Sequence, residues 1–506
     1  MQLLNPFRQR ALLAFALFSL SLAACKKDDA TTVTPDPNTG TTAGQTVEVT
    51  EVKTSTTWTA SNKYLLKGYV YVRSGATLTI EPGTIIKGDK DSKGALIVEP
   101  GAKLIAAGTA AKPIVFTSNQ PKGSRNYGDW GGVILAGNAP VNSIVNGVKP
   151  VVEGGPTTTY GGTDAADNSG TLQYVRIEFG GIAFSPNNEV NGLTLCAVGS
   201  GTTLDHIQVS YSGDDSYEWF GGTVNAKYLI AHRGYDDDFD TDNGFSGKVQ
   251  FAVSLRDPLQ ADQSGSKAFE SDNDANASDN LPKTSAVFSN VTVIGPLNNI
   301  NNVGGISSQY VAAAHIRRNS AQSIMNSVLL GYPAGLLLDH AKTAANVASN
   351  DLRFQNNILA GMAAGTSATR NQKNIVYLGP TGGAGSLTPT STMSADTSAF
   401  GTAVGPLSWL YNSNNKNKRY TNADEVRLLN PFSLTAPSFL PLTTSPIVYT
   451  STTNANPVVA PAFTDSKVSD SFFTRTSYIG AFSGSGQSSE NWATGWTNFD
   501  PQNTDY

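Results

Sequence analysis

Short runs in which apolar and polar residues alternate recur along most of the chain, and Gly, Asn or Asp separates each run from the next. Such runs are typical of β-strands, whereas long stretches with the apolar period of a helix are scarce. The Glu-Pro-Gly phrase at residues 81–83 returns 18 residues later at 99–101. Ile207, Leu229 and Phe251 hold matching places in three runs at intervals of 22 residues. The pattern therefore predicts strands that repeat with a period near 20 residues.

Asparagine stands at the start of three later apolar runs, at Asn290, Asn326 and Asn356, where the side-chain amides of successive coils would stack. A period near 20 residues with short strands and Asn or Gly corners favours a parallel β-helix, in which each coil buries its apolar side chains inside one cylinder. Leucine-rich repeats have a similar period, but the regular leucine pattern that they need is absent. A sandwich or propeller is the main alternative and would show hairpin turns and longer periods.

The predicted β-helix, a solenoid, occupies residues 47–360. The less regular remainder, residues 361–506, is expected to hold long loops and an irregular end of the helix. Its tail is aromatic, with Trp492, Trp496 and Phe499. Because a solenoid needs its open end covered, we expect this tail to cap the helix rather than to bind a ligand.

The N-terminus has the features of a lipoprotein signal peptide over residues 1–24. Arg8 and Arg10 precede a short apolar run at residues 11–20, and small residues lead up to Cys25. The run is too short for a membrane span, which needs about 20 apolar residues. The segment resembles the lipobox of bacterial lipoproteins, so Cys25 is the expected site of covalent lipid attachment. An ordinary signal peptide, with the cysteine as a bystander, is the alternative.

Residues 25–46 are predicted to form a disordered, lipidated linker, because residues 30–46 are almost wholly Thr, Pro, Gly, Asp and Asn and cannot bury a core. The Lys-Lys-Asp-Asp phrase at residues 26–29 resembles the export signal that sends lipoproteins of some Gram-negative glycan degraders to the outer face. We therefore expect a protein anchored in the outer membrane by lipid and facing the cell exterior. The second cysteine, Cys196, lies in an apolar run and is expected to be a small core residue.

The net charge is −5 at pH 7, and only 15% of the residues are charged. This mild acidity argues against a nucleic-acid partner. The expected partners are instead the outer membrane, through the lipid, and a polysaccharide. The acids are not evenly spread, since residues 211–244 hold the densest group of them.

The 22-residue period places three pairs of acids in this group on neighbouring coils: Asp214 with Asp236, Asp215 with Asp237, and Glu218 with Asp240. Neighbouring strands lie ~4.8 Å apart, so two ionised carboxylates would repel by about 3 kcal/mol at an effective dielectric of ~20. A bound cation, a raised pKa or splaying into water would relieve the repulsion. A hard ion such as Ca²⁺ suits a set of oxygen ligands. The predicted metal ligands are Asp214, Asp215, Glu218, Asp236, Asp238, Asp240 and Asp242. A solvated acidic turn is the alternative.

The same carboxylates are candidates for catalysis, since glycoside hydrolysis needs two acids at a fixed separation. The Gly-Asp-Asp phrase at residues 213–215 faintly resembles the paired-aspartate motif of polygalacturonase-type β-helices. The catalytic candidates are Asp214, Asp215 and Asp237. The Gly-His-Gly and Arg-Ile-Lys motifs of those enzymes are missing, and residues 316–318 are only a loose echo of the second motif.

Aromatic and basic residues flank the acids. The candidates for stacking on sugar rings are Tyr211, Tyr217, Trp219 and Tyr235, with core packing as the alternative. Arg233 and Arg256 fall about one coil apart and are candidate bases for a lyase, although salt bridges are the commoner role for such residues.

Residues 214–227 and 236–241 together resemble a family of secreted bacterial lipoproteins with a right-handed parallel β-helix of the pectin-lyase-like fold. Members of that family also tend to end in a phrase like residues 495–499. The resemblance implies the fold and a surface destination but not a function. The first hypothesis is a non-catalytic surface lipoprotein that binds glycan or another surface, with Ca²⁺ as a structural cation. The alternative is a polysaccharide lyase or glycoside hydrolase that acts through the stacked aspartates.

Overall fold

The computed structural model describes residues 44–185, 188–297, 305–362, 374–377, 405–448, 460–484 and 491–506. The predicted signal peptide, Cys25 and almost all of the linker lie outside the described residues, as does most of the segment 363–404. Within the described residues, no helix is long and apolar enough to cross a membrane.

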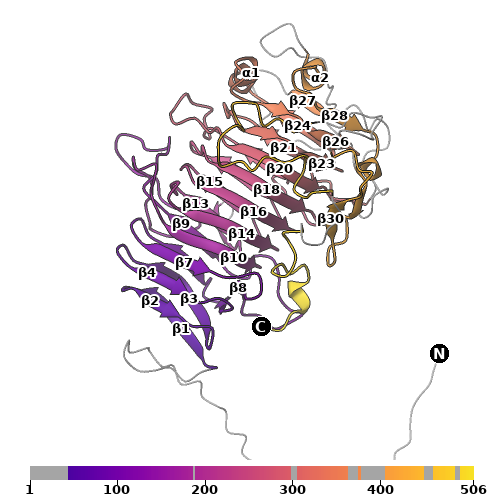
Figure 1. Cartoon of the computed structure of the whole chain (residues 1–506). Helices are drawn as coiled ribbons and strands as arrows, with labels where there is room; N and C mark the ends of the chain where they lie inside the picture. The colour runs from indigo at the N-terminus through magenta and orange to yellow at the C-terminus, as the bar shows by residue number, and fades with distance from the viewer. Residues whose placement is uncertain are drawn as a thin grey trace, which may run out of the picture.

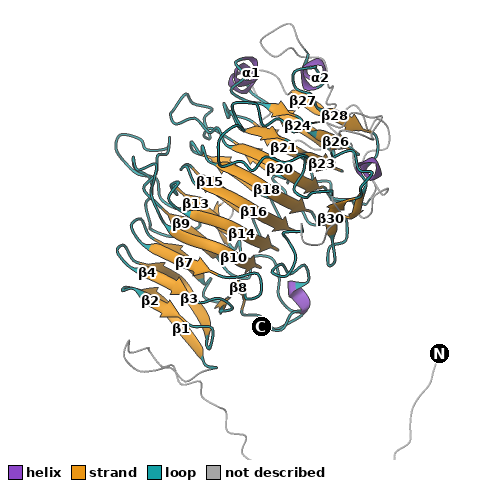
Figure 2. Ribbon diagram, viewed as in Figure 1, coloured by secondary structure: helices purple, strands orange, loops and turns teal. Residues whose placement is uncertain are grey.

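The chain winds into stacked coils of parallel strands, as predicted (Figures 1 and 2). The strand pairings fall into three sheets. Sheet I contains β1 (Thr46–Val52), β3 (Lys63–Val72), β5 (Ile85–Gly88), β8 (Ile114–Ser118), β23 (Val328–Leu330), β26 (Ile358–Ala360) and β28 (Lys418–Tyr420). Sheet II contains β2 (Thr56–Trp58), β4 (Thr77–Ile80), β7 (Lys103–Ala107), β22 (Ser323–Met325) and β25 (Phe354–Gln355).

Five long strands bend between sheets II and I and belong to both: β10 (Gly170–Glu178), β14 (Thr203–Ser210), β16 (Asn225–His232), β18 (Lys248–Leu255) and β20 (Val287–Ile294). Sheet III continues from the ends of β1 and β3 through β6 (Ala95–Val98), β9 (Gly132–Ala136), β13 (Leu193–Cys196), β15 (Tyr217–Phe220), β17 (Phe239–Asp242), β19 (Phe269–Ser271), β21 (Ala312–Ile316), β24 (Ala334–Leu338) and β27 (Ile375–Tyr377). Strands β27 and β28 thus lie beyond residue 360, in the segment expected to hold the irregular end of the helix.

Among the described residues, antiparallel strand pairs occur only outside the coils. They are β11 (Ala183–Ser185) with β12 (Asn188–Glu189), and β29 (Leu428–Asn430) with β30 (Ser438–Pro441). Two short helices, α1 (Ala341–Ala348) and α2 (Pro406–Leu410), lie near the C-terminal coils. Parallel pairing between coils excludes the sandwich and propeller alternatives, both of which are built from antiparallel strands.

The predicted 22-residue register is confirmed for β14 and β16, where Ile207 pairs with Leu229. It is wrong by one residue for the next coil, because Leu229 pairs with Ala252 and not with Phe251. Phe251 instead stacks on Tyr228 at the bend between sheets II and I, with ring centroids 5.2 Å apart. Both bend residues have a positive φ, 61° for Phe251 and 60° for Tyr228, which turns the chain from one sheet to the next.

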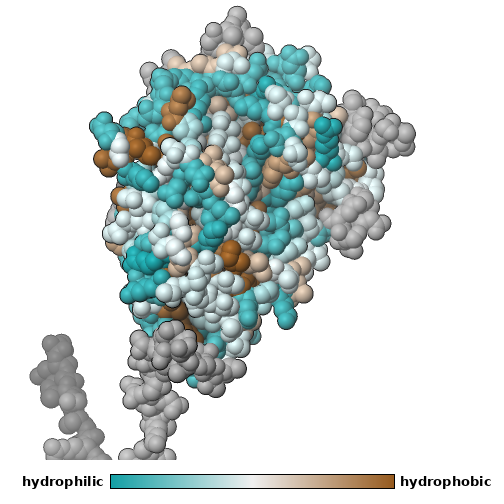
Figure 3. Space-filling model, turned by 60° about the vertical axis from the view of Figure 1, so that its left-hand side comes forward, coloured by the Kyte–Doolittle hydropathy of each residue, from teal (hydrophilic) through white to brown (hydrophobic). Residues whose placement is uncertain are grey.

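Apolar side chains fill the inside of the coils, and the surface is mostly polar. The outer face in Figure 3 is largely hydrophilic, with apolar side chains showing as separate spots. Cys196 is fully buried, as predicted, but it lies against the outside of sheet III beside Tyr160 and Phe220. Burial raises the pKa of its thiol well above the ordinary value, so the thiol stays neutral.

The C-terminal segment runs back along the outside of the coils, where a row of amide side chains holds it. This corner row consists of Gln208, Gln250, Asn290, Asn326 and Asn356. The Gln250 amide accepts from the Thr474 N–H at 2.8 Å and donates to the Thr474 carbonyl at 2.7 Å. Gln208 holds Asn498 in the same two ways, at 2.8 Å each. The asparagines of the repeated phrases therefore bind returning backbone, and Asn290 also accepts from the Gln250 amide on the neighbouring coil at 3.1 Å.

The aromatic tail lies along the side of the coils, whereas the sequence suggested that it covers an open end. Trp492 and Trp496 pack edge-on against His206, 6.2 and 5.6 Å away between ring centroids. The last residue, Tyr506, donates its hydroxyl to Glu178 at 2.6 Å, so the C-terminus reaches the early coils near β8 (Figure 1). Apolar side chains on the outer face of sheet I explain this position, because the tail buries them.

Candidate functional site

Three carboxylates stand in line on the outer face of sheet III. Glu218 of β15 pairs with Asp240 of β17, and Asp240 pairs with Glu270 of β19. Successive side chains of a strand point to opposite faces, so the neighbours of these acids point into the core. Tyr217 and Phe239 are both fully buried there. We call Glu218, Asp240 and Glu270 the acidic row.

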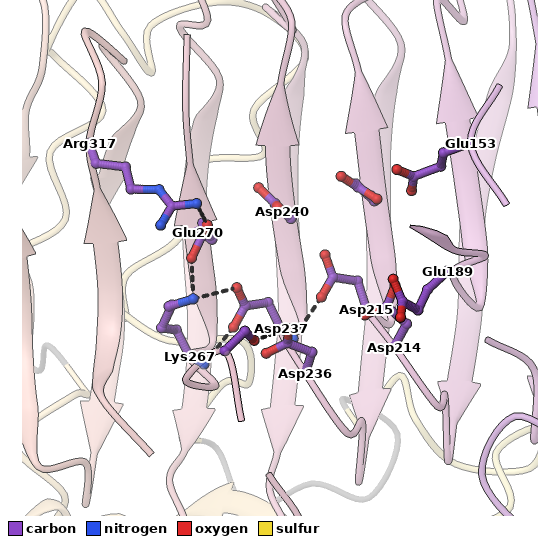
Figure 4. A pocket seen from close by; sticks show the side chains of 12 residues that line it. Glu153, Glu189, Asp214, Asp215, Asp236, Asp237, Asp240, Lys267, Glu270 and Arg317 are labelled. Atoms are coloured by element: carbon purple, nitrogen blue, oxygen red, sulfur yellow. Dashed lines mark hydrogen bonds and ion pairs between the residues drawn. The ribbon is translucent and has the colours of Figure 1, made fainter. Parts of the chain in front are cut away.

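Four more acids come from the turns that precede β15 and β17. Asp215 accepts a hydrogen bond at 2.7 Å from the backbone N–H of Asp237 on the next coil. Asp214 and Asp236 lie beside them at the mouth of the same pocket (Figure 4). The 22-residue period therefore placed the paired acids correctly.

The acids line a pocket of about 190 Å³ on the outside of the β-helix (Figure 4). Its lining consists of Glu153, Glu189, Asp214, Asp215, Glu218, Asp236, Asp237, Asp240, Ser264, Lys267, Glu270 and Arg317. Nine of these twelve residues are carboxylic acids and only two are basic. The pocket therefore carries a large excess of negative charge when its acids are ionised.

Both basic residues lie at one end of the pocket and are already paired. The Lys267 ammonium lies 3.2 Å from Asp237 and also forms an ion pair with Glu270. Arg317 pairs with Glu270 and with Asp272, the latter at 2.9 Å. At the other end, among the described residues, only the amide of Asn191 is seen to bridge Glu153 and Glu218. Among the described lining residues, both basic side chains thus lie at the end of the pocket formed by Asp237 and Glu270.

Three overlapping groups of acids have ligand atoms within 4.8 Å of one another. They are Asp214 with Asp215 and Asp236; Asp215 with Glu218 and Asp240; and Asp237 with Asp240 and Glu270. Oδ1 of Asp236 and Oδ1 of Asp240 are shielded from solvent and have no hydrogen-bond donor. Such orphaned carboxylate oxygens fit a hard divalent cation, which takes oxygen ligands at 2.3–2.6 Å in the case of Ca²⁺. The carboxylate oxygens of these acids are therefore suitable ligands for the predicted Ca²⁺ ion.

Burial and mutual repulsion shift the acids toward their neutral forms. Burial, opposed in part by Lys267, raises the pKa of Asp237 to about 8. Burial and the charge of Asp242 raise the pKa of Asp240 to about 7. The pKa values of Asp214, Asp215 and Glu218 are also raised well above the ordinary range, by burial first and by neighbouring carboxylates second. Without a cation, several of these groups hold protons at neutral pH.

Asp238 and Asp242 do not join the pocket lining, although the sequence analysis named both as metal ligands. Asp238 points inward, is fully buried and pairs with the Arg256 guanidinium at 2.8 Å. Asp242 lies beyond the pocket and accepts from the backbone N–H of Asn243 at 2.6 Å. The acids at residues 236, 238, 240 and 242 fall at every second position and would share one face of an extended strand. Asp238 does not, because β17 begins only at Phe239 and the segment before it is not extended.

The aromatic candidates for sugar stacking do not line the pocket either. Tyr217 and Trp219 are fully buried inside the coils, because they occupy the inward positions of β15. Tyr211 is buried beneath Arg233, and half-buried Tyr235 packs on the ring of Tyr127. These four residues therefore serve in packing.

Arg233 and Arg256, the candidate lyase bases, are both ion-paired, as the structural alternative predicted. Arg233 pairs with Asp257, and Arg256 pairs with Asp238. Neither residue lines the pocket.

Sequence reasoning missed five lining residues that carry charge: Glu153, Glu189, Lys267, Glu270 and Arg317. A signal for Glu270 was present, since the Phe-Asp-Thr-Asp phrase at residues 239–242 returns as Phe-Glu-Ser-Asp at 269–272. The interval of 30 residues hid it, because the coil between them carries a longer loop. Glu153 and Glu189 come from excursions outside the coils, and no periodic pattern marks them.

Comparison with known proteins gives one match. The family model of the pectate-lyase-like β-helix domain matches residues 50–404, well over half of the chain. No curated protein matches, and no solved structure matches. With its three parallel sheets and an acid-lined pocket on the outside of one of them, the chain belongs to the family of pectate-lyase-like β-helix domains.

Proposed function

We propose that this protein is a lipid-anchored β-helix of the cell surface that holds Ca²⁺ in its acidic pocket and binds a glycan or another surface there. One observation carries the proposal. Nine acids converge on one pocket, and the two basic residues among them compensate only one end of it. Carboxylates gathered at such density need cations to stay ionised.

Ca²⁺ bound among these acids would do two things. It would neutralise the repulsion between Asp215, Glu218 and Asp240, which stabilises the coils that carry them. Its remaining coordination positions would face the open side of the pocket, where an anionic group such as the carboxylate of a uronic acid could complete them. Arg317 and Lys267 would add positive charge at the edge of that position.

Cation binding is tested by calorimetric titration with Ca²⁺ and by thermal unfolding in Ca²⁺ and in EDTA. A ligand present at 100 times its Kd stabilises the folded state by about 2.7 kcal/mol, so we expect a melting temperature several degrees higher in Ca²⁺. Asp215→Asn should remove most of this gain, because Asp215 belongs to two of the three acid groups. Asp91→Asn, at an exposed position away from the pocket, is the matched control. An identical melting temperature in EDTA and Ca²⁺ would rule out the cation site.

The surface location rests on the N-terminal sequence alone. Cys25 would carry the lipid, and residues 25–46 would space the β-helix from the outer membrane. The Cys25→Ala protein should be lost from the membrane fraction. Protease added to intact cells should degrade the unsubstituted, lipid-anchored protein. Survival of the protein in intact cells would contradict an outward orientation.

Catalysis on a polysaccharide is the second candidate function. The observation that favours it is the raised pKa of Asp237, about 8, which would let this residue donate a proton to a leaving group at neutral pH. Asp214 and Asp215 on the neighbouring coil would then supply the second carboxylate. Incubation with uronic-acid and neutral glycans should yield new reducing ends or unsaturated products, and Asp215→Asn and Asp237→Asn should abolish them. Activity that survives both substitutions would refute this assignment.

A further inference from the structure

We propose that Lys267 is a built-in counter-ion that occupies one of the three acid groups and closes it to metal. The inference rests on the proposed cation site and deepens it, because it sets how many ions the pocket takes. Two of the groups would bind Ca²⁺, whereas the ammonium of Lys267 fills the third.

The position of the Lys267 ammonium carries the proposal. Asp237, Asp240 and Glu270 form the third acid group. The ammonium lies 3.2 Å from Oδ2 of Asp237 and contacts Oε2 of Glu270, so it sits between two members of the group (Figure 4). An ion that bound these acids would need the space that the ammonium already fills.

The surroundings of Lys267 hold it in place. Its side chain is only 6% exposed. Lysine is rarely buried unless it has a charged partner, and Lys267 has two, Asp237 and Glu270. Its backbone N–H donates to Oδ1 of Asp237 at 2.5 Å, which fixes the start of the side chain against the same carboxylate. Arg317, which directly follows β21 on the next coil, contacts the other oxygen of Glu270. Because these contacts already order the lysine side chain, keeping the ammonium in the acid group costs little further conformational entropy.

The other two groups contain no basic side chain. Asp215, shared by both of them, accepts from the backbone N–H of Asp237 and from no ammonium or guanidinium group among the described residues. Oδ1 of Asp236 and Oδ1 of Asp240 lack any donor. The pocket therefore divides into an open part of two groups and a part that is neutralised from within.

The test counts ions. Equilibrium dialysis with radioactive Ca²⁺ gives the number bound to the whole protein, and Lys267→Met removes the ammonium while keeping an unbranched side chain. We expect one additional ion in Lys267→Met. Lys267→Arg keeps the charge and should bind the same number as the unsubstituted protein. Lys248→Met is a matched control, because Lys248 pairs with the single carboxylate of Asp470 on the surface.

Stability gives an independent readout. In EDTA, Lys267→Met should unfold at a lower temperature than the unsubstituted protein, because Glu270 loses one of its two basic partners and Asp237 loses a hydrogen-bond donor. Ca²⁺ should raise its melting temperature by more than it raises that of the unsubstituted protein. If Lys267→Met does not fold in EDTA, refolding in Ca²⁺ should recover it, and failure to recover would refute the proposal.

The experiment distinguishes failure of the proposed function from failure of this inference. An unsubstituted protein that binds no Ca²⁺ would refute the proposed function. An unsubstituted protein that binds Ca²⁺, together with a folded Lys267→Met that binds no additional ion, would overturn this inference alone.

Discussion

The acidic row and the corner row are both lines of polar side chains on the outside of the coils, and they are satisfied in opposite ways. The corner row is made of neutral amides, and the backbone of the C-terminal segment supplies its partners, as in the paired hydrogen bonds of Gln250 with Thr474. The acidic row is made of carboxylates, and within the part of the chain that the structure describes, Glu270 at one end is the member that receives basic side chains.

The difference follows from the chemistry of the groups. An amide both donates and accepts, so a passing peptide satisfies it completely, whereas a carboxylate only accepts and brings charge. A row of amides can therefore be sealed by the chain itself. A row of carboxylates stays open until cations or protons arrive, and for this reason the acidic row is the better candidate for binding something from outside.

Substitution of Asp238 should have the largest effect and separates the core from the pocket. Asp238 is close in sequence to the acids of the pocket, but its carboxylate lies inside the coil and pairs with Arg256. Asp238→Asn would leave a buried guanidinium without its counter-charge, and we expect a loss of about 3–5 kcal/mol in the free energy of unfolding, measured with urea. The loss should be equal in Ca²⁺ and in EDTA.

Asp240→Asn is the contrasting variant, because Asp240 has carboxylate neighbours along the acidic row. In EDTA its free energy of unfolding should be equal to or higher than that of the unsubstituted protein, since one repelling charge is gone. In Ca²⁺ it should be lower. Equal behaviour of Asp238→Asn and Asp240→Asn would show that our division between core and pocket is wrong.

The fold could be predicted from the sequence because every coil has the same pattern of core and surface positions. Apolar side chains return at each coil, and the register of β14 and β16 follows directly from Ile207 and Leu229. The error at Phe251 arose because a bend residue with positive φ can be apolar and aromatic, so it mimics a core position. Hydrophobicity alone does not distinguish a residue at a bend between sheets from a residue in the core.

The site could be predicted only where it is periodic. Asp215 and Glu218 were found because the next coil repeats them, but Glu153 and Lys267 come from an excursion and a longer loop. Their place in the pocket depends on how those segments fold back onto sheet III, which a repeat does not encode. Asp238 was misplaced for a related reason, since the alternation of side chains applies only within the strand.

Breaking the corner row should have a moderate effect. Gln250→Ala removes both hydrogen bonds to Thr474, and Gln208→Ala removes both hydrogen bonds to Asn498. Each substitution removes two hydrogen bonds to the returning backbone, and at about 0.5–1.5 kcal/mol for each bond we expect it to lower the free energy of unfolding by about 1–3 kcal/mol. Gln120→Ala, at a half-exposed position outside the row, should change it by less than about 0.5 kcal/mol. Losses no larger than that control would mean that water replaces the amides and that the row does not hold the tail.

The pH dependence of stability should show the smallest effect, because the acids of the pocket titrate, in the acidic row and beside it, whereas the amides of the corner row do not. An aspartate ionises at about pH 3.9 in the unfolded chain. In the folded protein without a cation, the pKa is about 7 for Asp240 and about 8 for Asp237. Between these limits the folded state holds protons that the unfolded state has lost, so stability is greatest at low pH and falls as pH rises to about 8. Each such proton contributes a slope of about 1.4 kcal/mol per pH unit.

Melting temperatures in EDTA should therefore fall from pH 5 to pH 8. Saturating Ca²⁺ should flatten the curve, because the bound ion keeps the carboxylates ionised. Curves that coincide in EDTA and Ca²⁺ would mean that the acidic row is satisfied within the chain after all, as the corner row is.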